Sequence, residues 1–291
     1  MFKDIGIYTG FIANAIKETY AYKFRAMIWI VYDFVFLFIE YFLWRAIFEA
    51  NGGKMYNVTM QQYIGYIVIG MFVARLTRCN IDFDISTEVK NGNIVMNLLK
   101  PYSYLKMNFA KYLGYTVGGA FTLIPVIIAV YFMAGIPNVG LKTWAAFAVS
   151  VLFAFIIGFL FSLVIGMLAF WLTNIWGLNL FKWNLIALFS GQMIAVNMFF
   201  KFGENGLPNL PVAFLPAEIL QTFFRVMGYI AYALPFQAIF YTPSAIYSGM
   251  IGGSKAVMIH IMLQMFWVIF MAAVIKIMWN RAQNKLTIMG G

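Results

Sequence analysis

Long apolar stretches separated by short polar segments dominate this chain. A helix needs about 20 predominantly apolar residues to cross the ~30 Å hydrocarbon core of a bilayer. Six stretches are candidates for such helices, near residues 26–48, 63–81, 112–134, 144–173, 183–200 and 256–279. The pattern therefore predicts an all-α polytopic membrane protein with six transmembrane helices.

Residues 1–25 have a different, amphipathic pattern. Their apolar side chains recur at helical spacing, at Ile5, Tyr8, Phe11, Ile12, Ala15, Ile16 and Tyr20. Such a helix typically lies in the plane of the membrane interface, although a cytoplasmic helix packed on other protein would show the same pattern. We assign residues 1–25 to an N-terminal interfacial helix and 26–291 to the transmembrane domain.

The pattern of residues 201–254 does not predict a further transmembrane helix. They hold five of the chain's eight prolines, namely Pro208, Pro211, Pro216, Pro235 and Pro243. Non-helical backbone survives at membrane depth only where protein or a water-filled cavity satisfies its hydrogen bonds. We expect short re-entrant or interfacial helices here, on the outer side of the membrane.

Charge placement favours an even number of spans. The chain has 20 Lys and Arg against 10 Asp and Glu, a net charge of +10. With six spans and both termini cytoplasmic, fourteen basic residues lie inside, Lys182 among them. The remaining six are Arg45, Lys54, Lys142, Lys201, Arg225 and Lys255. This excess fits the positive-inside rule and predicts a multi-pass protein of the bacterial inner membrane.

Composition excludes several other classes. Hydrophobic residues make up 63% of the chain and charged residues only 10%, whereas a soluble domain has about 25% charged residues. The positive charge therefore reflects membrane topology rather than nucleic-acid binding. Cys79 is the single cysteine and His260 the single histidine. This inventory offers no internal disulfide, no multi-histidine metal site and no catalytic residues that we would assign.

Four polar residues within the expected spans are candidates for a substrate pathway. Asp33 and Glu40 lie seven residues apart in the first span, so they share one helix face. Carboxylates inside a membrane are costly and usually face a cavity or a partner. They could bind a cationic or amphipathic substrate, or pair structurally with Arg45 or a charge on another helix. Gln192 and Asn197 could line the same pathway, or join helices by hydrogen bonds.

Small residues recur at a spacing of four in the fourth span, at Gly158, Ser162 and Gly166. Such a ridge allows a second helix to approach closely. A chance occurrence in a glycine-rich membrane protein would look the same.

Residues 82–100 are too polar to span and have an ordered pattern. Helix-starting side chains open the segment, at Asp82, Asp84, Ser86 and Thr87. Asn91-Gly92 breaks the helix, and an apolar stripe that includes Ile94, Leu98 and Leu99 follows before Pro101. The pattern indicates a short surface helix and an amphipathic helix that dock a soluble partner. A plain solvated loop is the alternative.

This segment resembles the one that follows the second helix in ABC-2 type permeases, the membrane subunits of many ATP-binding-cassette exporters. In that family an acidic residue and a glycine precede a Leu-Leu-x-Pro ending, matched here by Glu88, Gly92 and Leu98-Leu99-Lys100-Pro101. The resemblance extends over essentially the whole chain. It includes Ser190-Gly191-Gln192, Leu234-Pro235-Phe236 with Pro243, and Trp279-Asn280-Arg281-Ala282. These features are similar to a branch grouped with viologen and drug exporters, although Ala195 stands where that pattern has proline.

The resemblance implies that 82–100 is the coupling segment that docks on the ATPase. The residues it assigns to coupling are Asp84, Glu88, Lys90, Gly92, Ile94, Leu98, Leu99 and Pro101. The chain lacks a G-x-x-x-x-G-K-[ST] loop, so it is expected to be a transport subunit rather than an enzyme. It would hold no cofactor itself, because ATP and Mg²⁺ bind to the partner ATPase.

The implied assembly has two ATPase subunits and a second permease, identical or related, within the lipid bilayer. The expected function is export of an amphipathic or cationic small molecule, or of a lipid-like substrate. The alternative is an ion-coupled secondary transporter that uses Asp33, Glu40 and His260 as ion sites. We detect no internal repeat of the kind that many such transporters show.

Overall fold

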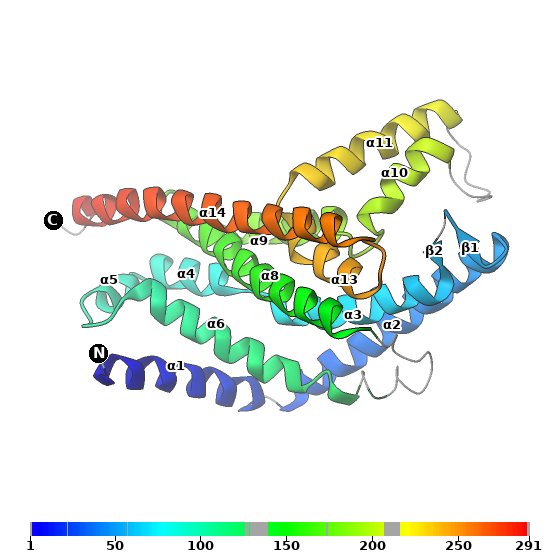
Figure 1. Ribbon diagram of the computed structural model, residues 1–291. Helices are drawn as coiled ribbons and strands as arrows, with labels where there is room; N and C mark the ends of the chain where they lie inside the picture. Colours follow the sequence, from blue (N-terminus) through cyan, green and yellow to red (C-terminus); the bar gives the residue numbers. More distant parts are fainter. Residues whose placement is uncertain are drawn as a thin grey trace.

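The chain folds almost entirely into helices. The computed structural model describes residues 2–21, 23–56, 58–125, 128, 139–172, 174–206 and 216–289 (Figure 1). In these ranges the only strands are β1 (Lys54–Met55) and β2 (Val58–Thr59), which pair antiparallel. The all-α prediction is confirmed.

Four helical segments in the described part of the chain are long and apolar enough to cross a membrane. They are Met27–Ala50, Met60–Lys90, Leu141–Phe170 and Ser254–Lys285. The helices that form them are α2 (Lys23–Ala50), α3 (Met60–Thr77) with α4 (Ile81–Lys90), α8 (Leu141–Met167) with the 3-10 turn η1 (Leu168–Phe170), and α14 (Ser254–Met289). They match the first, second, fourth and sixth expected spans by length and composition.

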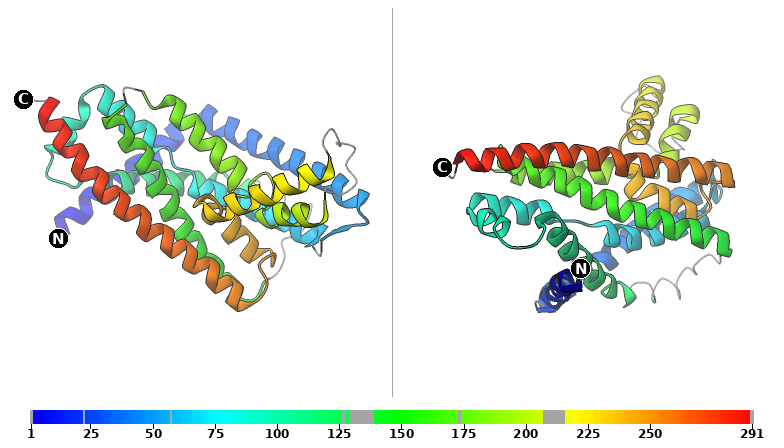
Figure 2. Two further views of the ribbon diagram at one scale, coloured as in Figure 1. Left: turned by 90° about the horizontal axis from the view of Figure 1, so that it is seen from above. Right: turned by 60° about the vertical axis from the view of Figure 1, so that its left-hand side comes forward.

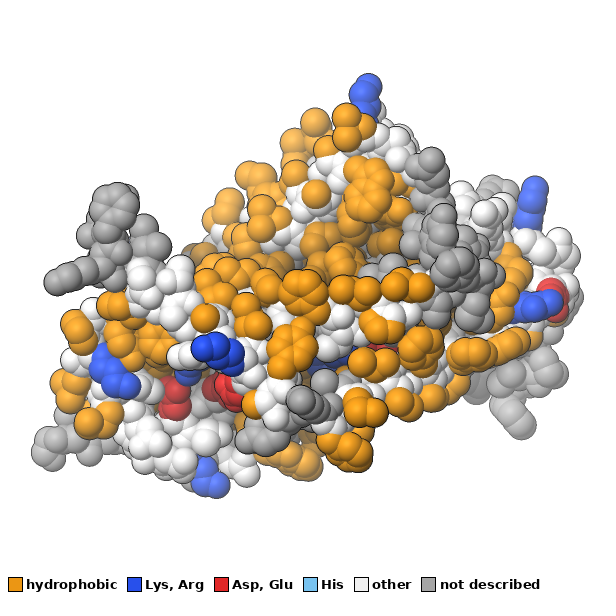
Figure 3. All heavy atoms as spheres, turned by 90° about the horizontal axis from the view of Figure 1, so that it is seen from below, with side chains coloured by type: hydrophobic (Ala, Val, Ile, Leu, Met, Phe, Trp, Pro, Cys, Tyr) orange, Lys and Arg blue, Asp and Glu red, His pale blue; other side chains and the backbone are white. Residues whose placement is uncertain are grey.

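The outer surface fits a lipid environment. Figure 3 shows hydrophobic side chains across the middle of one face, with most of the charged side chains toward its ends. α8 and α14 stay side by side in both views of Figure 2 and pack along each other. The molecule is therefore a multi-pass membrane protein.

The third and fifth expected spans differ from the sequence prediction. α6 (Tyr104–Phe121) begins before residue 112 and ends four residues before Pro125. Residues 126, 127 and 129–134 of that span lie outside the described residues. The fifth span is not one helix, because α9 (Trp176–Phe189) and α10 (Val196–Asn205) are separated by a non-helical turn. A total of six spans stays a prediction.

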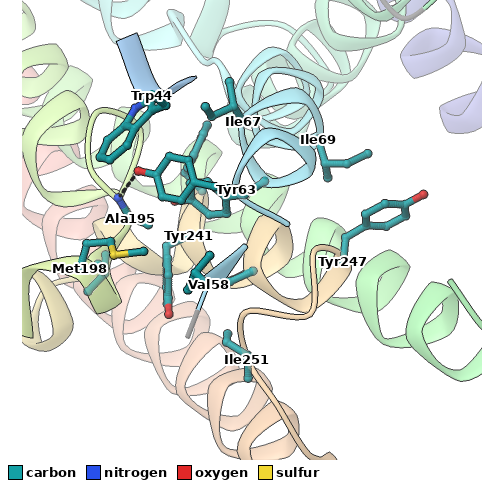
Figure 4. Close-up of a cluster of buried hydrophobic side chains, with 14 of the residues drawn as sticks. Trp44, Val58, Tyr63, Ile67, Ile69, Ala195, Met198, Tyr241, Tyr247 and Ile251 are labelled. Atoms are coloured by element: carbon teal, nitrogen blue, oxygen red, sulfur yellow. Dashed lines mark hydrogen bonds between the residues drawn. The ribbon is translucent and has the colours of Figure 1, made fainter. Parts of the chain in front are cut away.

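Contacts with α3 and α13 (Tyr241–Tyr247) hold the break between α9 and α10 in place. Gly191 has φ 91°, a conformation that favours glycine, and its carbonyl accepts a hydrogen bond from the Tyr66 hydroxyl at 2.6 Å. The Tyr241 N–H donates to the Ser190 carbonyl at 3.0 Å. Figure 4 shows Tyr63 directed at the Ala195 N–H, which donates to its hydroxyl at 3.4 Å. A proline at position 195 would have no N–H to donate, so this contact requires a residue other than proline.

Residues 196–250 contain helices of 4 to 17 residues. α10 packs against α11 (Ala217–Ala233), and the two project from the long helices in Figure 1. α12 (Phe236–Ile239) and α13 follow and are buried throughout. Pro208 and Pro211 lie outside the described residues. The membrane depth of these helices stays a prediction.

The N-terminal helix α1 (Phe2–Ala21) packs along α6. The Tyr20 hydroxyl donates to the Gly118 carbonyl at 2.8 Å, and the Tyr115 hydroxyl donates to Glu18 at 2.7 Å. A Cβ on Gly118 would lie 2.9 Å from the Thr19 hydroxyl, so the glycine allows the close approach. The partner of α1 is thus the chain's own α6, and its place at the membrane interface stays a prediction.

The small-residue ridge of α8 receives the backbone that joins α3 to α4. A Cβ on Gly158 would lie 2.7 Å from the Thr77 carbonyl oxygen, and one on Gly166 would lie 2.9 Å from the Asp82 Cα. Between them, the Ser162 hydroxyl donates to the Cys79 carbonyl at 2.9 Å. The prediction that these residues permit close packing is confirmed, with the same chain as partner.

We predict that Gly158→Val destabilises the fold. The added side chain meets backbone that cannot swing away, and overpacking of this kind costs about 1–3 kcal/mol. Gly177→Val is the matched control, because Gly177 is also helical and has no atom within 4 Å of the added Cβ. Thermal unfolding of the purified chain in detergent measures both. If Gly158→Val and Gly177→Val lower the unfolding temperature equally, packing at the ridge does not depend on close approach.

Candidate functional site

Residues 82–100, which the resemblance assigns to coupling and which we keep calling the coupling segment, fold as two short helices. α4 ends at Lys90, and α5 (Asn93–Leu98) begins after the Asn91–Gly92 turn. Gly92 has φ 72° and precedes α5 directly, so glycine meets a conformational need at this position. The structure therefore supports two helices rather than the alternative of a solvated loop.

One side of the coupling segment is anchored to the rest of the protein. Ile81, Ile85 and Ile94 are buried in a cluster with residues of α6, α8 and α14. Glu88 accepts a hydrogen bond from the Tyr104 hydroxyl at 2.7 Å and lies 3.6 Å from Lys111 Nζ. Burial, reinforced by the nearby Glu88 carboxylate, raises the pKa of Tyr104, so its hydroxyl stays protonated and donates. Glu88 and Ile94 thus hold the segment in place.

The other coupling residues are less buried. Asp84 and Leu98 are half-buried, while Lys90, Leu99 and Pro101 are exposed. Lys90 lies in the last turn of α4, where a cation complements the helix dipole. The eight predicted residues therefore divide into an anchoring group and an outward-facing group.

Apolar side chains also face outward on this segment. Val95, Met96 and Leu99 are 47%, 65% and 77% exposed, and we call these three residues the tip. Exposed apolar side chains gathered in one place mark contacts with another protein or a membrane. Anchored on one side and apolar on the other, the segment is suited to hold a partner.

A buried ion pair that the sequence did not reveal joins the coupling segment to α9. Lys182 Nζ lies 2.8 and 2.9 Å from the two carboxylate oxygens of Asp82, and both side chains are fully buried. Lys182 also donates to the Cys79 carbonyl at 3.0 Å and to the Ser162 hydroxyl at 3.3 Å. The Asn179 amide donates to the same carboxylate. The pair links α4, α8 and α9 through one cluster of polar atoms.

Sequence reasoning treated Asp82 as a helix-start residue and Lys182 as one of the cytoplasmic cations. The two residues are 100 positions apart, and no local pattern connects them. The spacing of Asn179 and Lys182, three residues apart on one helix face, is the nearest signal. It indicates a shared face but not its acidic partner.

The two candidate carboxylates of α2 both have protein partners. Asp33 forms an ion pair with Arg75 of α3. Glu40 is buried and accepts a hydrogen bond from Trp44 Nε1 at 2.8 Å. Arg45, considered as their partner, instead pairs with Glu49 at 2.8 Å.

Two cavities adjoin Arg75 and Arg78. One, of 350 Å³, is lined by residues of α1, α2, α3, α4 and α6, including Asp84, and we call it the α1–α6 cavity. The other, of 390 Å³, is lined by residues of α2, α3, α8, α9 and α12, and we call it the α2–α9 cavity. Arg75 and Arg78 line both.

The α2–α9 cavity brings together two of the four predicted pathway residues. Asp33 and Gln192 line it, whereas Glu40 and Asn197 line neither cavity. Asn197 lies in α10, beyond the helix break. His260 is buried between the rings of Tyr232 and Tyr241, at 5.6 and 6.1 Å, away from both cavities. Among the described residues, no group of three or more His, Cys, Asp or Glu side chains could hold a metal ion.

Together these features define a class: a multi-pass helical membrane protein with an anchored, outward-facing pair of short helices and a cavity among its spans. A family model described as ABC-2 family transporter protein matches residues 34–221, more than half of the chain, so this chain belongs to the ABC-2 transporter family. The matched range contains the coupling segment and both cavity arginines. Comparisons with curated proteins and with solved structures gave no match. The chain is thus the permease of an ABC transporter, a membrane transport subunit that is not itself catalytic.

We predict that Lys182→Met destabilises the protein by roughly 3–5 kcal/mol, because it leaves Asp82 buried without a counter-charge. The double variant Asp82→Leu with Lys182→Met should recover most of that loss, since it removes both charges. Lys201→Met is the control, because Lys201 pairs with Glu204 at 3.6 Å on an exposed surface, where ion pairs contribute little. Thermal unfolding in detergent provides the comparison. Failure of the double variant to recover would mean that the pair does not act as a unit.

Proposed function

We propose that this chain is the permease subunit of an ABC exporter in the bacterial inner membrane, with both termini cytoplasmic. It would act with two ATPase subunits and a second permease, identical or related. Membership of the ABC-2 family implies an ABC ATPase as partner. Export, the stoichiometry and the orientation are the proposed part. The observation that carries the proposal is the coupling segment, which is anchored on one side and apolar at its tip.

The contacts of the coupling segment suggest how force would travel. α4 follows α3 after three residues and packs on α8. The Asp82–Lys182 pair ties its first turn to α9. A push on the tip would therefore move α4 as a unit with parts of three other helices. ATP hydrolysis in the partner would thereby change the shape of the α2–α9 cavity, which α3, α8 and α9 line.

The alternative of an ion-coupled secondary transporter loses support. Its three proposed ion sites do not form one site, since Asp33 pairs with Arg75, Glu40 bonds to Trp44, and His260 lies among aromatic rings. Family membership also favours a partner ATPase over an ion gradient as the source of energy.

We predict that Leu99→Asp abolishes co-purification of the ATPase from native membranes. The change places a charge within the apolar tip and leaves the anchoring side chains untouched. Leu141→Asp is the matched control, because Leu141 is 86% exposed and begins α8, whereas the coupling segment lies near the end of that helix. Gly92→Pro is a second variant, since proline cannot adopt φ 72°. If both coupling-segment variants retain the ATPase, the docking assignment is wrong.

A further inference from the structure

Arg78 contacts two tryptophans, Trp183 of the α2–α9 cavity and Trp29 of the α1–α6 cavity. Its guanidinium carbon is 4.2 Å from the ring centre of Trp29 and 5.1 Å from that of Trp183. These rings come from α2 and α9, and Arg78 directly follows α3. Contacts with aromatic faces stabilise a guanidinium while its N–H groups remain free to bind at the edge.

Arg78 forms no ion pair with a carboxylate within the described residues. Arg75 is paired with Asp33, but no Asp or Glu of the described chain lies within 4.0 Å of the Arg78 nitrogens. No described protein group accepts a hydrogen bond from it, although a guanidinium has five donors. An Arg in a cavity with free donors is suited to bind a planar or tetrahedral anion.

The balance of charge differs between the two cavities. The α1–α6 cavity is lined by Arg75 and Arg78 and also by two acidic side chains, Glu18 and Asp84. The α2–α9 cavity is lined by the same two arginines and by Asp33 alone among acidic residues. Because Arg75 is paired with Asp33, the formal charge left over in this cavity is that of Arg78.

The rest of the α2–α9 cavity suits an apolar body. Its lining includes large apolar and aromatic side chains from α2, α3, α9 and α12, among them Phe36, Met71, Ile186 and Ile239. A volume of 390 Å³ lies within the usual range for small-ligand sites. The cavity thus joins one cationic group to an apolar surface.

We propose that the α2–α9 cavity binds an anionic amphipath, a molecule with a phosphate, sulfate or carboxylate group on an apolar tail. The anion lies on Arg78 beside Trp183, and the tail lies along the apolar lining. This assignment rests on the proposed function, because it names the substrate class of the permease. It reverses the charge expected from Asp33 and Glu40, which suggested a cationic substrate.

The test uses the full chain in dodecyl maltoside and a bromododecyl phosphate probe, whose bromine quenches nearby tryptophan fluorescence. We expect saturable quenching in the unaltered protein. Arg78→Met should raise the half-saturating concentration by about tenfold or more, as expected for the loss of a charge-assisted hydrogen bond. Arg78→Lys should retain part of the binding, and its folding is checked by thermal unfolding. Arg45→Met, an arginine of α2 outside the cavity, should leave the concentration unchanged.

Asp33→Asn distinguishes an anionic from a cationic substrate. It releases Arg75 from its ion pair and should tighten binding of the phosphate probe. A bromododecyl trimethylammonium probe should show no dependence on Asp33 or Arg78. Saturable binding of this cation that is lost in Asp33→Asn would overturn the proposal, as would phosphate-probe binding that ignores Arg78→Met.

Competitors identify the source of the anion. Displacement by phosphatidic acid in mixed micelles supports a lipid headgroup, and displacement by phenyl phosphate supports a soluble organic phosphate. Inorganic phosphate that competes as well as either would overturn the amphipathic part of the proposal. ATPase co-purification with the tip variants is a separate result. Loss of the ATPase in Leu99→Asp with no effect of Arg78→Met would retain the permease assignment and reject this site.

Discussion

The structure depends on the close approach between the α3–α4 junction and the small-residue ridge of α8. The backbone of Thr77 and Asp82 can approach α8 this closely because Gly158 and Gly166 have no side chain. That approach brings Asp82 within reach of Lys182 and places Cys79's carbonyl where both Ser162 and Lys182 donate to it. Because the cluster is buried away from water, each of these polar atoms needs such a partner. The junction therefore fixes three helices and the coupling segment at once.

The same junction places the coupling segment beside the cavities. Arg78 and Cys79 line the α2–α9 cavity, and Ile81 begins α4 only two residues after Cys79. The part of the chain that would meet the ATPase and the part that would meet the substrate are thus neighbours in sequence. A short, buried connection transmits movement with little loss, because packed interiors deform little under load.

The long helices could be predicted from sequence because their signal is local. α2, α8 and α14 each carry an apolar run that is longer than a bilayer core requires. The turn at Gly92 was predictable for the same reason, since Asn-Gly is a local break signal. The break between α9 and α10 was not, because its bonds come from Tyr66 and Tyr63, which lie 125 and 132 residues earlier. The apolar pattern of residues 183–200 is the same whether or not a distant tyrosine bonds to the backbone and stabilises a helix break there. For the candidate site, Asp33 and Arg78 show how far prediction from sequence goes. The sequence indicates that charged residues lie within the membrane, but it does not indicate which of them have a partner that neutralises them.

The packing of α1 on α6 has a consequence for biogenesis. Tyr20 bonds to Gly118, which is synthesised 98 residues later. At about 5–20 residues per second, that separation corresponds to roughly 5–20 s of translation. During this interval the N-terminal helix has been made and its partner has not. Until α6 is synthesised, the side of α1 that will pack on α6 must therefore contact the membrane surface or an insertion factor.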